Sequence, residues 1–339
     1  MLRLLLASAL LAVAALAAGA AGAAPRGPDA AVPCTSAQVG LLAPLSGPAA
    51  RVGREHEAWA RAALALRTTP RVRVELVVAD TGQDPASAAA PRTAAVVGPR
   101  TSAEALAAGP VLAAASLPLV SATASATVLA DGRLPTFFRV VPNDDAQAAR
   151  IARLLGETLG ARRVLVVDDG TVDSRPLALA LARRLAAAGV AADRATAEPG
   201  TGVAATAALV GPETDAVVVL WHVPARAQAL AVLLREKGKR APLVGGAGLA
   251  SPGELTAEGA PGVEGPAVFA AVRAAVVALE NACRDRRATR GEVVTWMRRT
   301  YLRPTPLGRP LAFDGRGQPR AAAYAVLQVR AGGRYAQVR

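Results

Sequence analysis

Residues 96–127 constrain the fold of this chain more than any other stretch, because two short apolar runs in it each end in small hydroxyl residues. Residues 96–97 and 119–120 have the composition of fully buried parallel strands. The Ala-rich segment between them predicts a short helix. Two neighbouring parallel strands would bring the hydroxyls together at their carboxyl ends, which is where open α/β sheets hold ligands.

The hydroxyl side chains after these runs are candidate ligand contacts. Small hydroxyls beside a helix N-terminus suit a carboxylate or another small anion, because unpaired backbone N–H groups point there. An alternative interpretation gives Ser102 and Ser121 only the role of helix caps or turn residues. The candidates are Thr101, Ser102, Ser121, Thr123 and Ser125.

The first 24 residues predict a secretory signal peptide. Arg3 precedes an apolar run over 4–18, and the small residues over 19–24 contain an A-x-A cleavage pattern. The run is too short and too Ala-rich to favour a retained membrane helix. We therefore expect an exported protein, periplasmic or extracellular. Lipid anchoring through Cys34 is not expected, because Pro33 precedes it and the apolar run ends well upstream.

Cysteine and histidine usage limits the chemistry of the chain. Cys34 and Cys283 are the only cysteines, and in an oxidising compartment such a pair is more often bridged than free. A bridge would tie the start of the first strand to a late helix. His56 and His222 lie far apart in sequence, so spacing predicts neither a metal site nor a Cys–His nucleophile pair. We expect no metal and no cofactor.

The formal net charge of +13 could indicate a nucleic acid or an anionic surface as a partner. The basic residues are almost all arginines spread thinly along the chain, and the densest cluster, 284–290, is interrupted by acid. Aromatic residues amount to 3%, so platforms for stacking single strands are lacking. We therefore expect no nucleic-acid partner.

Strand and helix signals alternate along the whole chain, which predicts α/β layers with mainly parallel sheets. The expected strands are 39–43, 72–78, 96–97, 119–120, 164–169, 216–220, 242–245 and two within 321–338. The expected helices are 54–66, 177–188, 225–236, 267–283 and 292–301. Residues 137–144 predict an extended crossing, with Asp144 placed to cap the helix that follows.

These signals describe two similar α/β units joined by several crossings. We expect two Rossmann-like lobes with a cleft and a hinge between them. The signal peptide would occupy 1–24, the N-terminal lobe 35–138 plus 266–318, and the C-terminal lobe 139–265 plus 319–339.

Several segments, in the same order, resemble the type I periplasmic solute-binding proteins of branched-chain amino acid ABC transporters. The resemblance covers nearly the whole chain beyond the signal peptide, and it implies a periplasmic binding protein type I fold. It also implies two lobes that close around a small solute, and a closed form that docks on an ABC permease in the membrane. We expect a monomer. The matching segments are VGLLAPLSGPAARVG (39–53), VVGPRTSAEALAAGPV (96–111), LPLVSATASAT (117–127), FRVVPNDDAQA (138–148), RVLVVDD (163–169) and RPLAFDGRGQ (309–318).

In this family the loops of the first lobe grip the carboxylate and ammonium groups of an amino acid through hydroxyls and backbone. The resemblance carries that role to Ser102, Thr123 and Ser125, with Thr101 and Ser121 as neighbours. In the second lobe, Val172 stands where the family usually offers a tyrosine.

Two further positions of the second lobe depart from the family pattern. His222, beside Trp221, falls nearest to a second aromatic position, and its alternative role is a rim histidine stacked on Trp221 without a ligand. Residues 245–248 read Gly-Gly-Ala-Gly where the family carries the acid that pairs with the ligand's ammonium. An unpaired buried ammonium is costly. One explanation is that another acid, Asp169 or Asp173, takes over this role. The other is that the ligand is not a zwitterionic amino acid, and we favour this explanation.

The chain is also shorter than the family pattern between 85 and 96 and between 265 and 267. The leading interpretation is an exported receptor that captures a small amino-acid-like or organic-acid ligand and delivers it to an ABC importer. The alternative is an exported sensory or interaction module of the same fold with altered or lost ligand binding. An enzyme is not supported, since neither a G-x-S-x-G elbow nor a G-x-G-x-x-G fingerprint is found.

Overall fold

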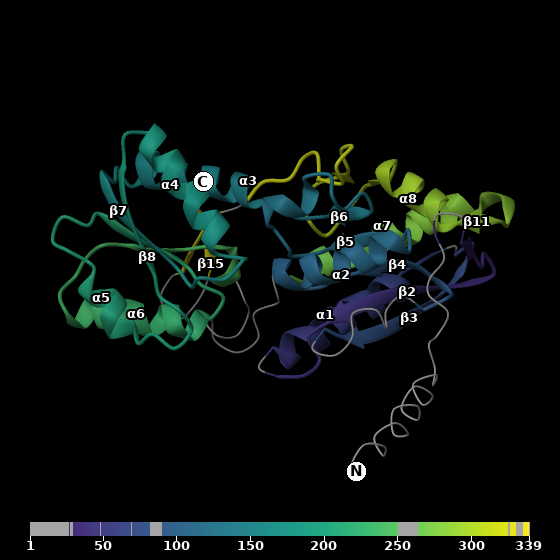
Figure 1. Ribbon diagram of the computed structural model, residues 1–339, viewed down its shortest axis with the longest axis horizontal. Coiled ribbons are helices and arrows are strands. Elements are labelled where there is room, and N and C mark those ends of the chain that lie inside the picture. Colours follow the sequence, from purple (N-terminus) through teal and green to yellow (C-terminus); the bar gives the residue numbers. More distant parts are fainter. Residues whose placement is uncertain are drawn as a thin grey trace, which may run out of the picture.

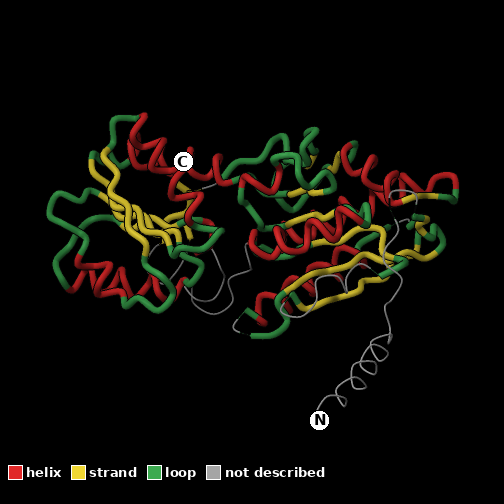
Figure 2. Tube along the Cα trace, viewed as in Figure 1, coloured by secondary structure: helices red, strands yellow, loops and turns green. Residues whose placement is uncertain are grey.

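The computed structural model describes residues 27, 30–47, 49–68, 70–81, 90–249, 264–324, 326–329 and 335–338. These residues form two lobes, each built around a parallel sheet with helices on both sides (Figures 1 and 2). The expected signal peptide over 1–24 lies outside the described residues, as do the turn at 82–85 and most of the linker at 259–266.

The first lobe contains a five-stranded parallel sheet in the order β3-β2-β4-β5-β6. Its central strand β4 is buried at every residue. β4 pairs in parallel with β5, with Val96 opposite Leu119 and Val97 opposite Val120, so the loops after these two strands leave the sheet at the same edge. The strands are β2 (Ser36–Ala43), β3 (Arg73–Asp80), β4 (Thr93–Val97), β5 (Leu119–Ser121) and β6 (Phe137–Arg139).

Helices from both ends of the chain cover this sheet. α7 is long and apolar enough to cross a membrane by length and composition, but most of its residues are buried against α1, α8 and β4, as in the core of a globular lobe. α1 and α7 approach closely at Gly265, where a Cβ would lie 2.0 Å from Nε1 of Trp59. The helices are α1 (Ala50–Ala65), α2 (Ser102–Ala114), α7 (Gly265–Ala282) and α8 (Arg290–Arg298).

The second lobe contains a four-stranded parallel sheet in the order β10-β9-β7-β8. α3 and α4 pack on one face of it and α5 and α6 on the other, each face with its own apolar cluster. The strands are β7 (Arg163–Asp168), β8 (Ala191–Thr196), β9 (Ala216–Leu220) and β10 (Leu243–Gly245). The helices are α3 (Asp144–Arg153), α4 (Arg175–Ala187), α5 (Val203–Ala208) and α6 (Pro224–Glu236).

Shorter elements complete the described part of the chain. β14 and β15 form the antiparallel hairpin predicted near the end of the chain. The antiparallel pairs are β1 (Ala31–Val32) with β11 (Ala288–Thr289), β12 (Tyr301–Leu302) with β13 (Leu311–Ala312), and β14 (Val326–Val329) with β15 (Tyr335–Val338). A π-helical turn, η3 (Leu154–Thr158), extends α3, and short 3₁₀ turns lie at η2 (Thr127–Ala130), η4 (Ala247–Leu249) and η5 (Cys283–Asp285).

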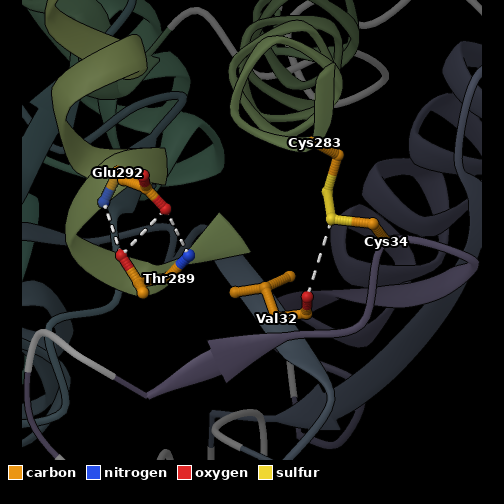
Figure 3. Close-up of a disulfide and its surroundings, with 5 residues drawn as sticks. All are labelled: Val32, Cys34, Cys283, Thr289 and Glu292. Atoms are coloured by element: carbon orange, nitrogen blue, oxygen red, sulfur yellow. Dashed lines mark hydrogen bonds between the residues drawn. A yellow bond between two sulfur atoms is a disulfide. The ribbon is translucent and has the colours of Figure 1, made fainter. Parts of the chain in front are cut away.

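A disulfide joins Cys34 to Cys283, with the two Cα atoms 5.4 Å apart (Figure 3). Cys34 lies two residues before β2 and Cys283 directly follows α7, so both ends of the bridge lie in the first lobe. Beside it, Thr289 and Glu292 form the capping box that begins α8 (Figure 3). The two cysteines are separated by 249 residues in sequence, so the bridge closes most of the chain into one loop.

The structure corrects the expected helix cap at the entrance to the second lobe. Asn143, not Asp144, is the N-cap of α3, and its side-chain oxygen accepts a hydrogen bond from Ala146 N at 3.0 Å. Asp144 is instead the first helical residue and is buried. The sequence analysis also missed β8 and α5, because β8 is a largely exposed edge strand with charged residues and α5 is only one and a half turns long.

Candidate functional site

A cavity of about 320 Å³ lies between the two lobes, and residues of both contribute to its walls. The loops after β4 and β5 provide Thr101, Thr123 and Ser125. The loops after β9 and β10 provide Trp221, His222 and the backbone of residues 246–248. The cavity therefore lies at the carboxyl ends of both parallel sheets, where α/β proteins bind ligands.

Three of the hydroxyl residues singled out in the sequence line the cavity. Thr101 is the N-cap of α2, and its hydroxyl accepts a hydrogen bond from Glu104 N at 3.2 Å. The hydroxyl of Thr123 donates to the carbonyl of Arg100 at 2.5 Å, which ties the two loops together. Ser125, the third of these hydroxyl residues, also lines the cavity. Each hydroxyl keeps a lone pair or a proton for a further partner, so contact of these three residues with a ligand stays a prediction.

Ser102 and Ser121 do not line the cavity, although the sequence analysis proposed both as ligand contacts. Both are fully buried. The Ser102 hydroxyl accepts from Ala126 N at 3.1 Å, and the Ser121 hydroxyl accepts from Ala124 N at 2.8 Å. These bonds fix the shape of the loop after β5, so the alternative role as structural turn residues is the one that their contacts support.

In the second lobe, Trp221 and His222 follow β9 directly and both line the cavity. The guanidinium of Arg226 lies 4.1 Å from the ring centroid of Trp221, in a cation–π contact. Arg226 therefore stacks on the Trp221 ring, and the two roles considered for His222 stay predictions. Nδ1 of His222 lies 3.5 Å from Oδ2 of Asp169.

The two acids proposed as replacements for the missing family acid lie in different places. Asp169 does not line the cavity, and its carboxylate accepts from Thr171 at 2.6 Å and from Ser174. Burial would raise the pKa of Asp169, but the hydrogen bonds from His222, Ser174 and Thr171 lower it well below its ordinary value. Asp169 is therefore an anion that holds its own loop and faces His222.

Asp173 does line the cavity, and it reaches across it. Its Oδ1 accepts a hydrogen bond from Ser102 N, the first residue of α2 in the other lobe, at 2.6 Å. A carboxylate at this position is stabilised by the unpaired N–H groups and the dipole of the helix. The second lobe therefore places its own anion where the sequence analysis expected a ligand's carboxylate.

A buried cluster of His56, Arg100 and Glu264 contributes Arg100 and Glu264 to the wall. Nε2 of His56 lies 2.7 Å from Oε2 of Glu264, and the Arg100 guanidinium contacts Oε1 at 3.0 Å. Burial would raise the pKa of Glu264, but the hydrogen bond from His56 and the charge of Arg100 outweigh it and lower that pKa to about 2. Sequence reasoning missed this cluster, whose one signal was an acid directly before the Gly-Pro start of an apolar helix.

The glycine-rich loop after β10 lies against the cavity through its backbone. Oε1 of Gln147 accepts from Ala247 N at 2.8 Å. A Cβ at residue 248 would lie 2.6 Å from Cδ2 of His222, so Gly248 leaves the space that this ring occupies. The loop carries no charged side chain. Where the family places an acid, this chain has small residues, and the ring of His222 lies against them.

The segment after β12 supplies two cavity residues that sequence reasoning also missed, Arg309 and Tyr324. The Tyr324 hydroxyl donates to the carbonyl of Pro142 at 2.8 Å, and burial raises its pKa well above the ordinary value. Arg309 is half buried, and its Nη1 donates to the carbonyl of Ala323 at 3.2 Å. Arg309 lies in the RPLAFDGRGQ segment that carried the family resemblance, but nothing in the sequence placed it at the cavity.

Arg139 and Asp144 lie buried behind the hydroxyl loop. Nη1 of Arg139 donates to the carbonyl of Ala126 at 2.9 Å and its Nε to Gln318 at 2.7 Å, so it joins this loop to the last crossing. Burial lowers the pKa of Arg139 to about 10. Burial also raises the pKa of Asp144 to about 6, and the nearby Ser125 hydroxyl and Arg139 charge offset this only in part.

We predict that an Asp144→Asn variant gains stability relative to the wild type as the pH rises from about 4 to about 6. The folded-state pKa of about 6 lies above the ordinary 3.8, so the folded state binds more protons than the unfolded state in this window, and stability falls as the carboxyl ionises. At pH 7 the free energy of unfolding of the variant should exceed that of the wild type by about 2–3 kcal/mol. Urea unfolding at pH 4, 5, 6 and 7 measures it, and a difference that is constant with pH would contradict the prediction.

Among the residues that the structure describes, no group of three or more histidine, cysteine, aspartate or glutamate side chains is arranged to hold a metal ion. The arrangement instead offers hydroxyls, backbone groups, paired charges and apolar side chains around a partly open cavity. These features define a two-lobed α/β binding protein with its site between the lobes.

Comparisons with known proteins agree with this class. A family model described as periplasmic binding protein matches residues 36–201. No curated protein matches the sequence significantly. The fold is similar to that of the leucine-binding protein LivK from Thermotoga maritima, with a TM-score of 0.78 and 19% identity over 89% of this chain and 98% of that one.

Two further structures with ligands share the fold. The branched-chain amino acid binding protein LivJ from Streptococcus pneumoniae, solved with isoleucine, has a TM-score of 0.71 and 19% identity over 89% of this chain and 98% of that one. A solute-binding protein from Rhodopseudomonas palustris, solved with 3,4-dihydroxybenzoic acid, has a TM-score of 0.74 and 14% identity over 88% of this chain and 94% of that one. The family model and these structures show that the chain has the fold of the type I periplasmic binding proteins. The matching family model describes binding proteins, not enzymes.

Proposed function

We propose that this protein is an exported receptor that captures a small amino-acid-like or organic-acid ligand between its lobes and delivers it to an ABC importer. The observation that carries the proposal is the cavity of about 320 Å³ with walls from both lobes. A site divided in this way couples ligand binding to the closure of the lobes, because only the closed form makes contacts from both sides. The cavity volume also falls in the range of pockets for small molecules.

The composition of the cavity wall supports a ligand with both polar and apolar parts. Thr101, Thr123 and Ser125 offer hydroxyls on one side, and Trp221 and His222 lie on the other. Apolar side chains of both lobes and of the crossings fill the wall between them. Such a wall surrounds a small molecule and orients it through a few polar groups, as in other ligand pockets.

The other parts of the proposal follow from the family and the sequence. Periplasmic binding proteins are exported, and the segment 1–24 has the pattern of a signal peptide. The Cys34–Cys283 disulfide fits an oxidising compartment. Similar structures include ABC transporter solute-binding proteins, which supports a membrane permease as the partner. We further propose a monomer without a nucleic-acid partner.

Thermal unfolding of the purified protein with a panel of amino acids, amides and organic acids tests ligand capture. We expect at least one small ligand to raise the Tm, because a ligand that binds only the folded state stabilises it by mass action. In a Thr123→Val, Ser125→Ala double variant we expect the shift to be lost. Thr295→Ala, which changes an exposed hydroxyl on α8, is the control and should keep the full shift. A flat response over a broad panel would contradict the receptor proposal.

One observation favours the alternative, an exported interaction module with altered ligand binding. The Asp173 carboxylate already joins the lobes at the N-terminus of α2, so the contact between the lobes there does not depend on a ligand's anion. Binding of the purified protein to its candidate permease separates the two proposals. A receptor should bind the permease more strongly with ligand, whereas a module of this kind should bind its partner equally with and without it.

A further inference from the structure

The anion site expected at α2 is occupied by the protein itself. Ser102 N, at the helix N-terminus, donates to Asp173 Oδ1 at 2.6 Å. The Ser102 hydroxyl does not line the cavity, since it is fully buried and accepts from Ala126 N. A ligand's carboxylate would therefore meet the negative charge of Asp173 at this position, and it must find its partner elsewhere in the cavity.

Arg309 offers that partner. It lines the cavity, it is half buried, and among the described residues its guanidinium makes one hydrogen bond, from Nη1 to the carbonyl of Ala323. No ion pair joins Arg309 to a carboxylate of the described residues. A half-buried guanidinium with donors to spare binds a carboxylate strongly, because its planar fork can make two parallel hydrogen bonds.

The acids at and around the cavity are committed to other groups. Glu264 is paired with His56 and Arg100. Asp173 is bonded to Ser102 N, and Asp169 holds its own loop and lies outside the cavity wall. Both described acids that line the cavity, Asp173 and Glu264, are therefore already engaged, and an ammonium group buried without a carboxylate partner would be costly.

The rest of the wall is largely apolar. The aliphatic and aromatic side chains come from both lobes and from the crossings between them, so they enclose the middle of the cavity. They include Val141, Leu177, Leu220, Trp221 and Leu307. This surface favours a hydrocarbon or aromatic body over a polar one.

The geometry points to a small monocarboxylate with an apolar or aromatic body and no ammonium group as the ligand, with its carboxylate bound by Arg309. This inference rests on the proposed function, since it specifies what the same cavity binds. The hydroxyls of Thr123 and Ser125 line the same cavity and remain available to other polar groups of the ligand. Arg309 is the residue that selects for the carboxylate, and the glycine loop at 246–248 is the reason that an amino acid is not preferred.

Isothermal titration with matched ligand pairs tests the ligand class. We expect 4-methylpentanoate to bind at least roughly tenfold more tightly than leucine, which differs only by the ammonium group. We also expect benzoate to bind more tightly than benzamide, which lacks the charge. Tighter binding of leucine would overturn this inference and leave the receptor proposal standing. If no member of either pair binds, the inference is overturned as well, and the broad thermal panel decides separately whether the receptor proposal stands.

Variants of Arg309 test the residue. Arg309→Gln should weaken carboxylate binding by roughly 10- to 100-fold, since a charged hydrogen bond contributes about 1.5–3 kcal/mol. Arg309→Lys should recover part of the affinity. Arg316→Gln, an exposed arginine of the same segment that does not line the cavity, is the matched control and should bind as the wild type does. Thermal unfolding without ligand verifies that each variant is folded. Unchanged affinity in a folded Arg309→Gln variant would overturn the assignment.

Discussion

Replacing Cys34 and Cys283 together by serine should lower the free energy of unfolding by about 2–4 kcal/mol. The bridge closes a loop of 249 residues, so it removes a large part of the conformational freedom of the unfolded chain. It also fixes the segment before β2 to the end of α7, two parts of the first lobe that are remote in sequence. Guanidinium unfolding of the wild type and the double variant, monitored by circular dichroism, measures the difference.

Reduction supplies the control for this prediction. Dithiothreitol should shift the wild-type midpoint towards that of the double variant and should leave the midpoint of the double variant in place. This comparison separates loss of the crosslink from any effect of the serine side chains. Equal midpoints for the oxidised wild type and the variant would contradict a stabilising role for the bridge.

Glu264→Gln should lower the free energy of unfolding by about 3 kcal/mol at neutral pH, because it leaves the charge of Arg100 buried beside an amide. The three partners are largely buried, with side-chain exposures of 3% for His56, 14% for Arg100 and 16% for Glu264. Breaking such a pair on one side costs more than the pair contributes, since Arg100 stays buried and loses this carboxylate.

The same cluster predicts a dependence on pH. The folded-state pKa of Glu264, about 2, lies below its ordinary 4.5, so its stabilising effect is complete above about pH 4.5 and is lost as the pH falls towards 2. The wild type should therefore approach the stability of Glu264→Gln between pH 4.5 and 2. Glu57→Gln, which breaks the exposed pair with Arg61, is the control and should cost about 0.5 kcal/mol or less. Equal effects of the two substitutions would show that the cluster contributes no more than a surface pair.

The arrangement of the strands around the first hydroxyl loops could be predicted because it depends on local patterns. Short apolar runs predicted β4 and β5, and the hydroxyls after them predicted the edge of the sheet at which the cavity lies. The same reasoning could not separate hydroxyls that face the cavity from those that face the protein. Ser102 and Thr101 are adjacent, yet the backbone turns one into the protein interior and the other towards the cavity.

The pairing and the placement of the charged groups of the site could largely not be predicted from the sequence. His56, Arg100 and Glu264 come from three distant segments, and their pairing follows from the packing of α1 on α7. Arg309 is one arginine among many in a basic chain, and no periodicity separates it from exposed ones such as Arg316. Asp173 was proposed from the sequence as a partner for a ligand's ammonium, but in the structure its carboxylate is bonded to Ser102 N.

The sequence by itself determined the two-lobed α/β fold, since alternating strand and helix patterns and the order of the family's segments are properties of neighbouring residues. It also determined which loops approach the site, because parallel strands must end at a common edge. Only the tertiary structure decided which charged groups pair with one another and which of them face the cavity. Electrostatic pairing depends on distances and burial between residues far apart in the chain, and the sequence does not contain these distances.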